Sequence, residues 1–283
     1  MIVPEITTRG LLNTTTVAIR DVSCRGSHKE RSAEEFTKAT HLVFPYRGLF
    51  VRHLGRDDAV AEANQVLFFN STDGYRVSHP VEGGDASLDL VVNEQVLHEL
   101  APASLLADGP SVSFRVQRAR IDPRAQALVA LLRHSLRHNT IEPLEADSLA
   151  LTLVRRAVGP RTTHSPGASP ARRKLVDRAK IVLASDPARR WTLAEIAAEV
   201  GHSPVYLTQV FQQVEGMPLY RYQLRLRLAR ALELLPQYDD LTSLGLDLGF
   251  SSHSHFTTTF TQVYGRSPSA FRNATSSPEA SWN

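Results

Sequence analysis

The sequence predicts a two-domain protein, in which an N-terminal all-β barrel with appended helices precedes an all-α domain of two helix-turn-helix subdomains joined by a long helix. Three observations predict it. Short runs of Val, Phe and Leu alternate with turn residues up to residue 118. A segment rich in Pro, Gly, Ser and Thr follows at 160–170, and beyond it one helix-turn-helix pattern occurs twice. At 283 residues the chain is long enough for a separate core in each domain.

The N-terminal runs have the length and composition of strands separated by turns. They predict strands at 41–44, 48–53, 65–69, 75–77, 88–92 and 112–116. Several short strands with turn signals between them are typical of a sandwich or barrel. Since such barrels hold small ligands at their centre or mouth, we expect 1–118 to be an effector-sensing domain.

Two amphipathic patterns in 119–159 predict helices, because their apolar residues recur at helical spacing. The first face contains Leu128, Leu132 and Leu136, and the second contains Leu149 and Leu153. We interpret 119–159 as a connector between the domains. The composition of 160–170 predicts a flexible linker, and 276–283 is expected to be a flexible tail.

The first helix-turn-helix unit carries start and stop signals for both of its helices. Thr192 and Glu195 have the spacing of a capping box, and Gly201 provides the positive φ that ends a helix. Ser203 then caps the next helix, with Pro204 at its first position. That second helix would turn Leu207, Val210 and Phe211 inward, and the residues left facing outward include Val205, Tyr206, Thr208 and Gln209.

The second unit repeats this arrangement. Gly249 makes the turn, Ser252 caps the second helix, and Phe256 and Phe260 face the core. The outward positions are His253, Ser254, Thr257 and Thr258. A helix of this kind enters the major groove, where Gln bonds adenine through two atoms and Thr packs on the thymine methyl. His253 and His255 make a poor metal pair, since two residues apart they point to different sides of a helix.

Residues 172–272 resemble the DNA-binding domain of AraC/XylS-type transcriptional regulators. The matching segments are 203–211, 216–218, 225–230, 249–252, 254–256 and 265–268, followed by Phe271 and Arg272. The resemblance implies two recognition helices in successive major-groove segments of promoter DNA, within a domain at 171–275. The implied base-reading residues are Val205, Tyr206, Thr208, Gln209, His253, Ser254, Thr257 and Thr258. We expect phosphate contacts from Ser203, Arg225, Arg227, Ser252 and Arg272, although a solvated face is the commoner case for any single arginine.

The chain departs from this family at four recognition positions. Family members often carry Arg or Lys where this sequence has Gln209, Gln212, Thr258 and Thr261. Arginine paired to guanine is the commonest specific contact, so neutral residues favour A·T-leaning or shape-based reading. They also predict a weaker dependence of binding on salt.

The segment 70–80 resembles the cupin-type sensor domain attached to many AraC-type regulators. Metal-binding cupins carry a His-x-His pair, a Glu and a later His, whereas here His41, His53 and His79 are scattered singly. We therefore expect no metal, no cofactor and no catalytic residue, and so no enzyme. The alternative is a cupin-type enzyme on small molecules with an accessory helical domain, which elemental analysis would test.

The resemblance also implies partners. In the family the region matching 119–159 often mediates dimerisation, so we expect a homodimer; the other interpretation is that these helices only cover the barrel. Binding of an unknown small-molecule effector would change the arrangement of the two domains and favour DNA binding. The DNA-bound protein would then recruit or block RNA polymerase. A ligand-independent dimeric regulator stays open. The net charge of +3, the single cysteine and the lack of a signal or spanning segment favour a cytoplasmic protein with no membrane partner.

Overall fold

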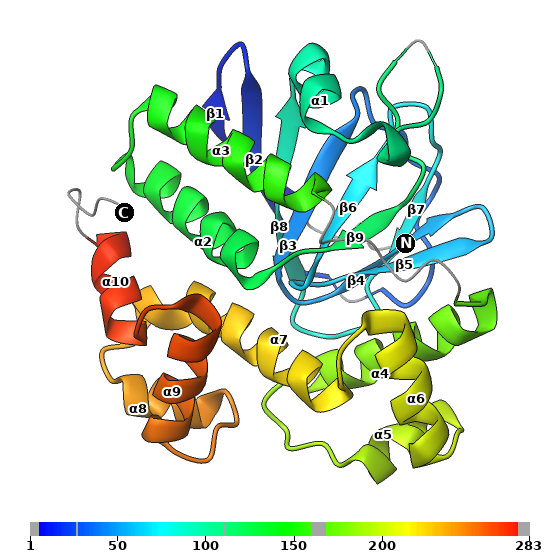
Figure 1. The fold of residues 1–283 in the computed structure, drawn as a ribbon, viewed down its shortest axis with the longest axis vertical. Helices are drawn as coiled ribbons and strands as arrows, with labels where there is room; N and C mark the ends of the chain where they lie inside the picture. Colours follow the sequence, from blue (N-terminus) through cyan, green and yellow to red (C-terminus); the bar gives the residue numbers. More distant parts are fainter. Residues whose placement is uncertain (1–5, 27, 110, 160–167, 277–283) are drawn as a thin grey trace.

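The computed structural model describes residues 6–26, 28–109, 111–159 and 168–276. A β-rich domain lies above a helical domain in Figure 1, and α7 crosses along the boundary between them. The fold class predicted from the sequence is confirmed. The predicted barrel, however, consists of two sheets that do not close on each other.

The larger sheet has six strands, and each neighbouring pair is antiparallel. Its strand order is β1 (Ile6–Asn13), β2 (Val17–Cys24), β8 (Asp85–Val92), β3 (His41–Arg47), β6 (Gln65–Phe69) and β9 (Arg118–Arg120). The smaller sheet has the order β5 (Asp57–Ala61), β4 (Phe50–Leu54) and β7 (Arg76–Ser78). Five predicted strands are therefore present, as β3, β4, β6, β7 and β8.

One predicted strand is absent from the structure, and the structure contains strands that the sequence did not predict. Residues 112–116 contribute only an isolated bridge between Phe114 and Leu106, because the side-chain amide of Asn70 occupies the backbone N–H and C=O of Phe114, at 2.8 and 3.0 Å. The chain pairs with β6 only afterwards, as β9. The sequence did not indicate β1, whose residues are mostly exposed, because an edge strand of this kind lacks the alternation of a half-buried one.

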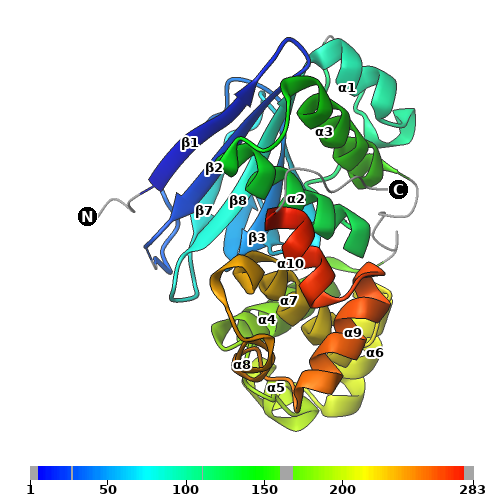
Figure 2. The same ribbon diagram turned by 90° about the vertical axis from the view of Figure 1, so that its left-hand side faces the viewer.

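Helices cover one face of the larger sheet (Figure 2). They are α1 (Glu94–Leu100), the short 3-10 turn η1 (Ala103–Leu105), α2 (Pro123–His138) and α3 (Pro143–Val158). The apolar faces of α2 and α3 belong to the same core as the sheet residues, with Leu132 and Leu153 fully buried. The interpretation that these helices cover the sheet therefore accounts for their apolar faces, and a dimer is not needed to explain them.

The C-terminal domain contains two three-helix subdomains. The first is α4 (Pro170–Ser185), α5 (Leu193–Val200) and α6 (Pro204–Glu215), and the second is α8 (Leu241–Asp247), α9 (His253–Tyr264) and α10 (Pro268–Ser276). The predicted long helix, α7 (Leu219–Leu234), joins them and ends in the turn η2 (Leu235–Gln237). Tyr222 of α7 belongs to the first core, and Leu228 and Leu232 belong to the second.

Two predictions about the ends of segments fall largely outside the described residues. Of the linker 160–170, only 168–170 is described; Ala168 is buried in the first helical core and α4 begins at Pro170. The tail 276–283 is described only at its first residue, where α10 ends. In the portion of the chain that the structure describes, no helix combines the length and the apolar character required to span a bilayer.

Candidate nucleic-acid interface and its contact with the sensor domain

The first helix-turn-helix unit is formed by the local signals in its sequence. The backbone N–H of Glu195 donates to Thr192 Oγ1 at 3.2 Å, and Glu195 Oε2 accepts from the N–H of Thr192 at 2.7 Å, which completes the capping box. Hydrogen bonds that the hydroxyl and the N–H of Thr192 and the guanidinium of Arg189 donate to the carboxylate lower the pKa of Glu195 to about 2. Gly201 ends α5 with φ of 72°, and Ser203 caps α6 by accepting from Tyr206 N.

The helices of the second unit are also capped by side chains at their N-termini. Asp240 caps α8 by accepting from the N–H groups of Thr242 and Ser243, each at 2.9 Å. Ser252 caps α9 by accepting from His255 N at 3.1 Å. The two serine caps thus lie at the equivalent ends of α6 and α9, beside the residues predicted to read bases.

The predicted base-reading residues lie on the solvent side of α6 and α9. Seven of them are exposed, Thr257 is half-buried, and Val205 is 68% exposed. Two hydroxyls are engaged within their own helices: Thr208 Oγ1 donates to Pro204 O at 2.9 Å, and Thr257 Oγ1 lies 3.3 Å from His253 Nε2. The side chain of Gln209 has no hydrogen-bond partner recorded among the described residues, so its amide is available to a base edge.

The arginines predicted to contact phosphates are directed elsewhere. Arg227 is 5% exposed and donates to the carbonyls of Pro187, Ala188, Arg189 and Gly249 at 2.8–3.2 Å. Arg225 donates to Ile121 O at 2.8 Å, and Arg272 donates to the carbonyls of Tyr238 and Asp239. Backbone carbonyls occupy these guanidiniums, so the geometry does not support phosphate contacts from them. Ser203 and Ser252 are exposed, and their phosphate contacts stay a prediction.

The bonds of Arg227 join the two subdomains. Three of its carbonyl partners precede α5 in the first unit, and the fourth is Gly249, in the turn between α8 and α9. The same turn packs so closely that a Cβ on Gly249 would lie 2.0 Å from Ala188 O, and Gly249 has φ of +80°. The relative position of α6 and α9 therefore depends on this contact.

A buried group of charges connects the N-terminal domain with the first subdomain. Arg118 of β9 makes a bidentate ion pair with Asp177 of α4, at 2.8 and 2.9 Å, and both side chains are at most 10% exposed. Lys180, on the same helix, lies 2.7 Å from Glu215 Oε1, and neither side chain is exposed. Arg120 donates to the backbone carbonyl of Glu215. The C-terminal end of α6 is thus held by residues of β9 and α4.

The C-terminal end of α9 is contacted by the N-terminal domain as well. Gln126 of α2 donates to Ala63 O at 2.8 Å and to Asn64 Oδ1 at 2.9 Å, and it accepts from the hydroxyl of Tyr264 at 3.4 Å. Ala127 of α2 is part of the second helical core. The N-terminal domain therefore contacts both recognition helices at the ends opposite their serine caps.

Glu62 is a buried carboxylate at this domain boundary. Burial raises its pKa, and the nearby charge of Lys180 opposes that rise. Its Oε2 accepts from Asn64 N at 2.7 Å. Sequence reasoning missed Glu62, Lys180 and Glu215. A signal existed for Lys180, which lies between Val176 and Leu183 on the inward-facing side of α4, where a lone charge requires a buried partner.

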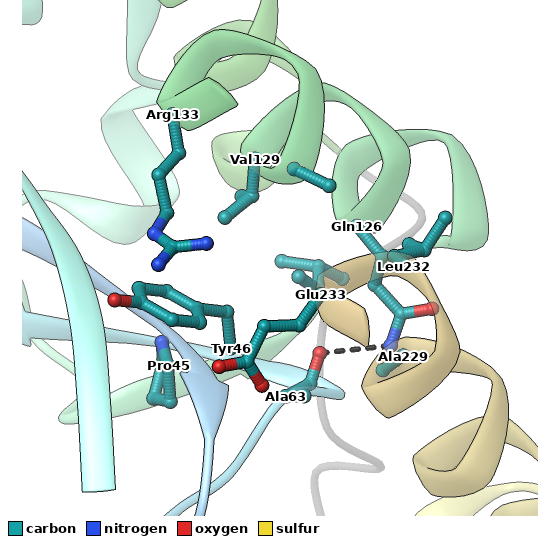
Figure 3. Close-up of a pocket in the computed structure, with 11 residues that line it drawn as sticks. Pro45, Tyr46, Ala63, Gln126, Val129, Arg133, Ala229, Leu232 and Glu233 are labelled. Carbon is teal, nitrogen blue, oxygen red and sulfur yellow. Dashed lines mark hydrogen bonds between the residues drawn. The ribbon is translucent and has the colours of Figure 1, made fainter. Parts of the chain in front are cut away.

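The cavities that could receive an effector were expected inside the barrel, but several lie between the domains. Figure 3 shows one, formed by Tyr46, Gln126, Arg133 and Glu233 among others, with room for about one water molecule. A larger hollow of about 580 Å³ lies between α2 and the α7–η2 turn and includes Arg133, Arg137 and His134. Another, of about 250 Å³, lies between the loop 81–84 and α4.

Residues 196–274 match the family model described as a helix-turn-helix domain. An uncharacterized HTH-type transcriptional regulator from Haemophilus influenzae is 30% identical over 104 residues, which cover 36% of this chain and 35% of that protein. The regulatory protein PocR of Salmonella typhimurium is 32% identical over 113 residues, covering 40% of this chain and 36% of PocR. The matches thus span about a third of the length of these curated relatives.

The chain is also similar to parts of solved structures. A transcriptional regulator from Chromobacterium violaceum, described as AraC-type, is 29% identical and matches 39% of this chain and 99% of that chain, with a TM-score of 0.36. Apo ToxT K231A from Vibrio cholerae is 11% identical and matches 93% of this chain and 98% of that chain, with a TM-score of 0.38. The predicted helix-turn-helix domain is confirmed by the family match in sequence.

We predict that Arg227→Ala lowers the free energy of unfolding by about 2–4 kcal/mol, because four carbonyls lose their donor. Urea unfolding measures the change. Arg221→Ala, an exposed arginine on the same helix, should change stability by less than about 0.5 kcal/mol. Equal losses in the two variants would contradict the role assigned to Arg227.

Proposed function

We propose that this protein is a transcription regulator that binds promoter DNA in the cytoplasm through α6 and α9. The observation that carries the proposal is the pair of capped helix-turn-helix units, whose exposed recognition surfaces are held in one relative position by Arg227. Two helices held in this way can enter successive major-groove segments of one duplex. The family match over 196–274 supports the same conclusion.

The chemistry of the recognition surface favours A·T-containing sites. The amide of Gln209, which has no hydrogen-bond partner among the residues that the structure describes, suits adenine, and the engaged hydroxyl of Thr208 leaves its methyl group to pack on thymine. Gln212, Thr258 and Thr261 are exposed and neutral. We therefore propose reading that depends little on guanine, with a shallow decrease of affinity with salt.

Replacing Gln209 and Thr257 together with Ala is expected to weaken binding to the preferred duplex at least about 10-fold, since good base contacts are each worth about 1–3 kcal/mol. Fluorescence anisotropy with the full-length protein measures the change. Gln262→Ala serves as the control, because Gln262 is exposed at the far end of α9 from the cap. If the double variant binds its preferred duplex as tightly as the wild type, these residues do not read bases.

We further propose that the sensor domain sets the DNA affinity through the charges at the domain boundary. Arg120 and Lys180 hold the C-terminal end of α6, and Gln126 holds the C-terminal end of α9. Arg118 holds α4, the helix that carries Lys180, so the two recognition helices are positioned before they meet DNA. Effector binding in the hollow beside Arg133 and Arg137 would change this contact. The DNA-bound protein would then recruit or block RNA polymerase.

Arg118→Ala is expected to lower the affinity for DNA about 5- to 150-fold although Arg118 lies outside the recognition helices, because it loosens α4, whose Lys180 holds the C-terminal end of α6. Removing one partner of a buried pair should also cost about 3–5 kcal/mol of stability, so binding is measured at a temperature where the variant is folded. Arg31→Ala breaks an ion pair with Asp58 that is largely exposed, and it should leave both quantities unchanged. A folded Arg118→Ala protein with wild-type affinity would refute the coupling.

A homodimer remains part of the proposal. Among the described strands β1 pairs only with β2, so its outer edge is available to a second chain. Sedimentation equilibrium with and without duplex DNA tests this assembly, and a monomer under both conditions would remove it.

A further inference from the structure

Three buried side chains of the sensor domain bring metal-ligand atoms together. A ring nitrogen of His79, Sγ of Cys24 and a carboxylate oxygen of Asp85 all lie within 4.8 Å of one another. The three residues are 6%, 4% and 7% exposed. They come from different parts of the chain: Cys24 ends β2, Asp85 begins β8 as its register partner, and His79 follows β7. The strand pairing therefore fixes two of the three positions.

His79 is held on one side and open on the other. Its Nδ1 lies 2.5 Å from Asp85 Oδ2, whereas its Nε2 is buried with no hydrogen-bond partner among the described residues. His53 provides the contrast within the same domain. It is also buried beside an aspartate, but both nitrogens are satisfied, Nδ1 by Asp58 at 2.7 Å and Nε2 by Ser78 Oγ at 2.8 Å. A histidine that only supports the fold would be expected to resemble His53.

We propose that Cys24, His79 and Asp85 form a binding site for a borderline-soft divalent cation of the zinc class. A thiolate, an imidazole and a carboxylate are the ligands that zinc takes in proteins. Tetrahedral zinc places its ligand atoms roughly 3.3–3.8 Å apart, so atoms within 4.8 Å need only small side-chain rotations to close on the ion. A water or a substrate group would complete the coordination. This set differs from the His-x-His arrangement of cupins, which the strand-rich half of the chain lacks.

The site lies directly behind a contact between the two domains. His79 and Asp85 flank the loop 80–84, and Val81 of that loop packs with Ile181 and Ala184 of α4. The loop is fixed closely against β2, since a Cβ on Gly84 would meet Cys24 O at 2.2 Å. A cation at the site stiffens the surface on which the DNA-binding domain rests. An effect of this stiffening on DNA binding rests on the proposed function, whereas metal binding itself does not.

Cobalt titration of the full-length protein under reducing conditions tests the site. The chain has one cysteine, so a thiolate-to-cobalt charge-transfer band can arise only from Cys24. We expect that band to saturate at one equivalent, to vanish in Cys24→Ser, and to require about 10- to 100-fold more cobalt in His79→Gln. His53→Gln should titrate like the wild type. Absence of the band in wild-type protein, or equal affinity in His79→Gln and wild type, overturns the proposal.

A second measurement needs no substitution and so does not depend on folding of a variant. X-ray absorption of the zinc-loaded wild-type protein should show one sulfur among nitrogen and oxygen ligands. A shell of nitrogen and oxygen alone would mean that zinc binds elsewhere. Zinc should also raise the unfolding temperature of the wild type but not of Cys24→Ser. None of these measurements involves DNA, so they can fail while the regulator proposal stands, and the reverse also holds.

Discussion

The guanidinium of Arg227 holds the two helix-turn-helix units in register. It donates hydrogen bonds to carbonyls of both units. These carbonyls belong to the segment before α5 in the first unit and to Gly249, in the turn of the second unit. A charged donor bound to several carbonyls is stronger than a neutral one, and its loss would leave those carbonyls without a partner. Because two recognition helices can read one duplex only at a fixed separation, the proposed activity depends on this interaction. An arginine that seemed suited to phosphate is thus structural.

The N-terminal domain extends this constraint across the domain boundary. Arg118 and Asp177 form an ion pair in the interior, as do Lys180 and Glu215, and Gln126 links α2 to Tyr264. Buried charges of this kind are costly to separate, so the domains have a strongly preferred arrangement. The hollows and the Cys24–His79–Asp85 cluster lie beside the same boundary. A ligand at any of them therefore acts where the position of the recognition helices is set.

The sequence predicted best those features whose causes are local. The cap at Thr192, the turn at Gly201 and the cap at Ser203 depend on partners within a few residues, and each is present. The partners of Arg227 lie 22 to 40 residues away, and Arg118 lies 59 residues from Asp177, so no pattern along the chain indicated them. The short strand β9 and the exposed edge strand β1 lack an alternation of apolar and polar residues, so the sequence did not indicate them. Their positions depend on neighbouring strands that only the fold brings together.

The most direct test of the central claim is selection of random duplexes by the full-length protein, followed by sequencing of the retained DNA. Two helices held by Arg227 should enrich a site with two short blocks about one helical turn apart, and the blocks should favour A·T pairs. Gln209→Ala should relax only the block read by α6. Retention of all sequences alike, fading uniformly with salt, would mean phosphate binding without reading and would contradict the account.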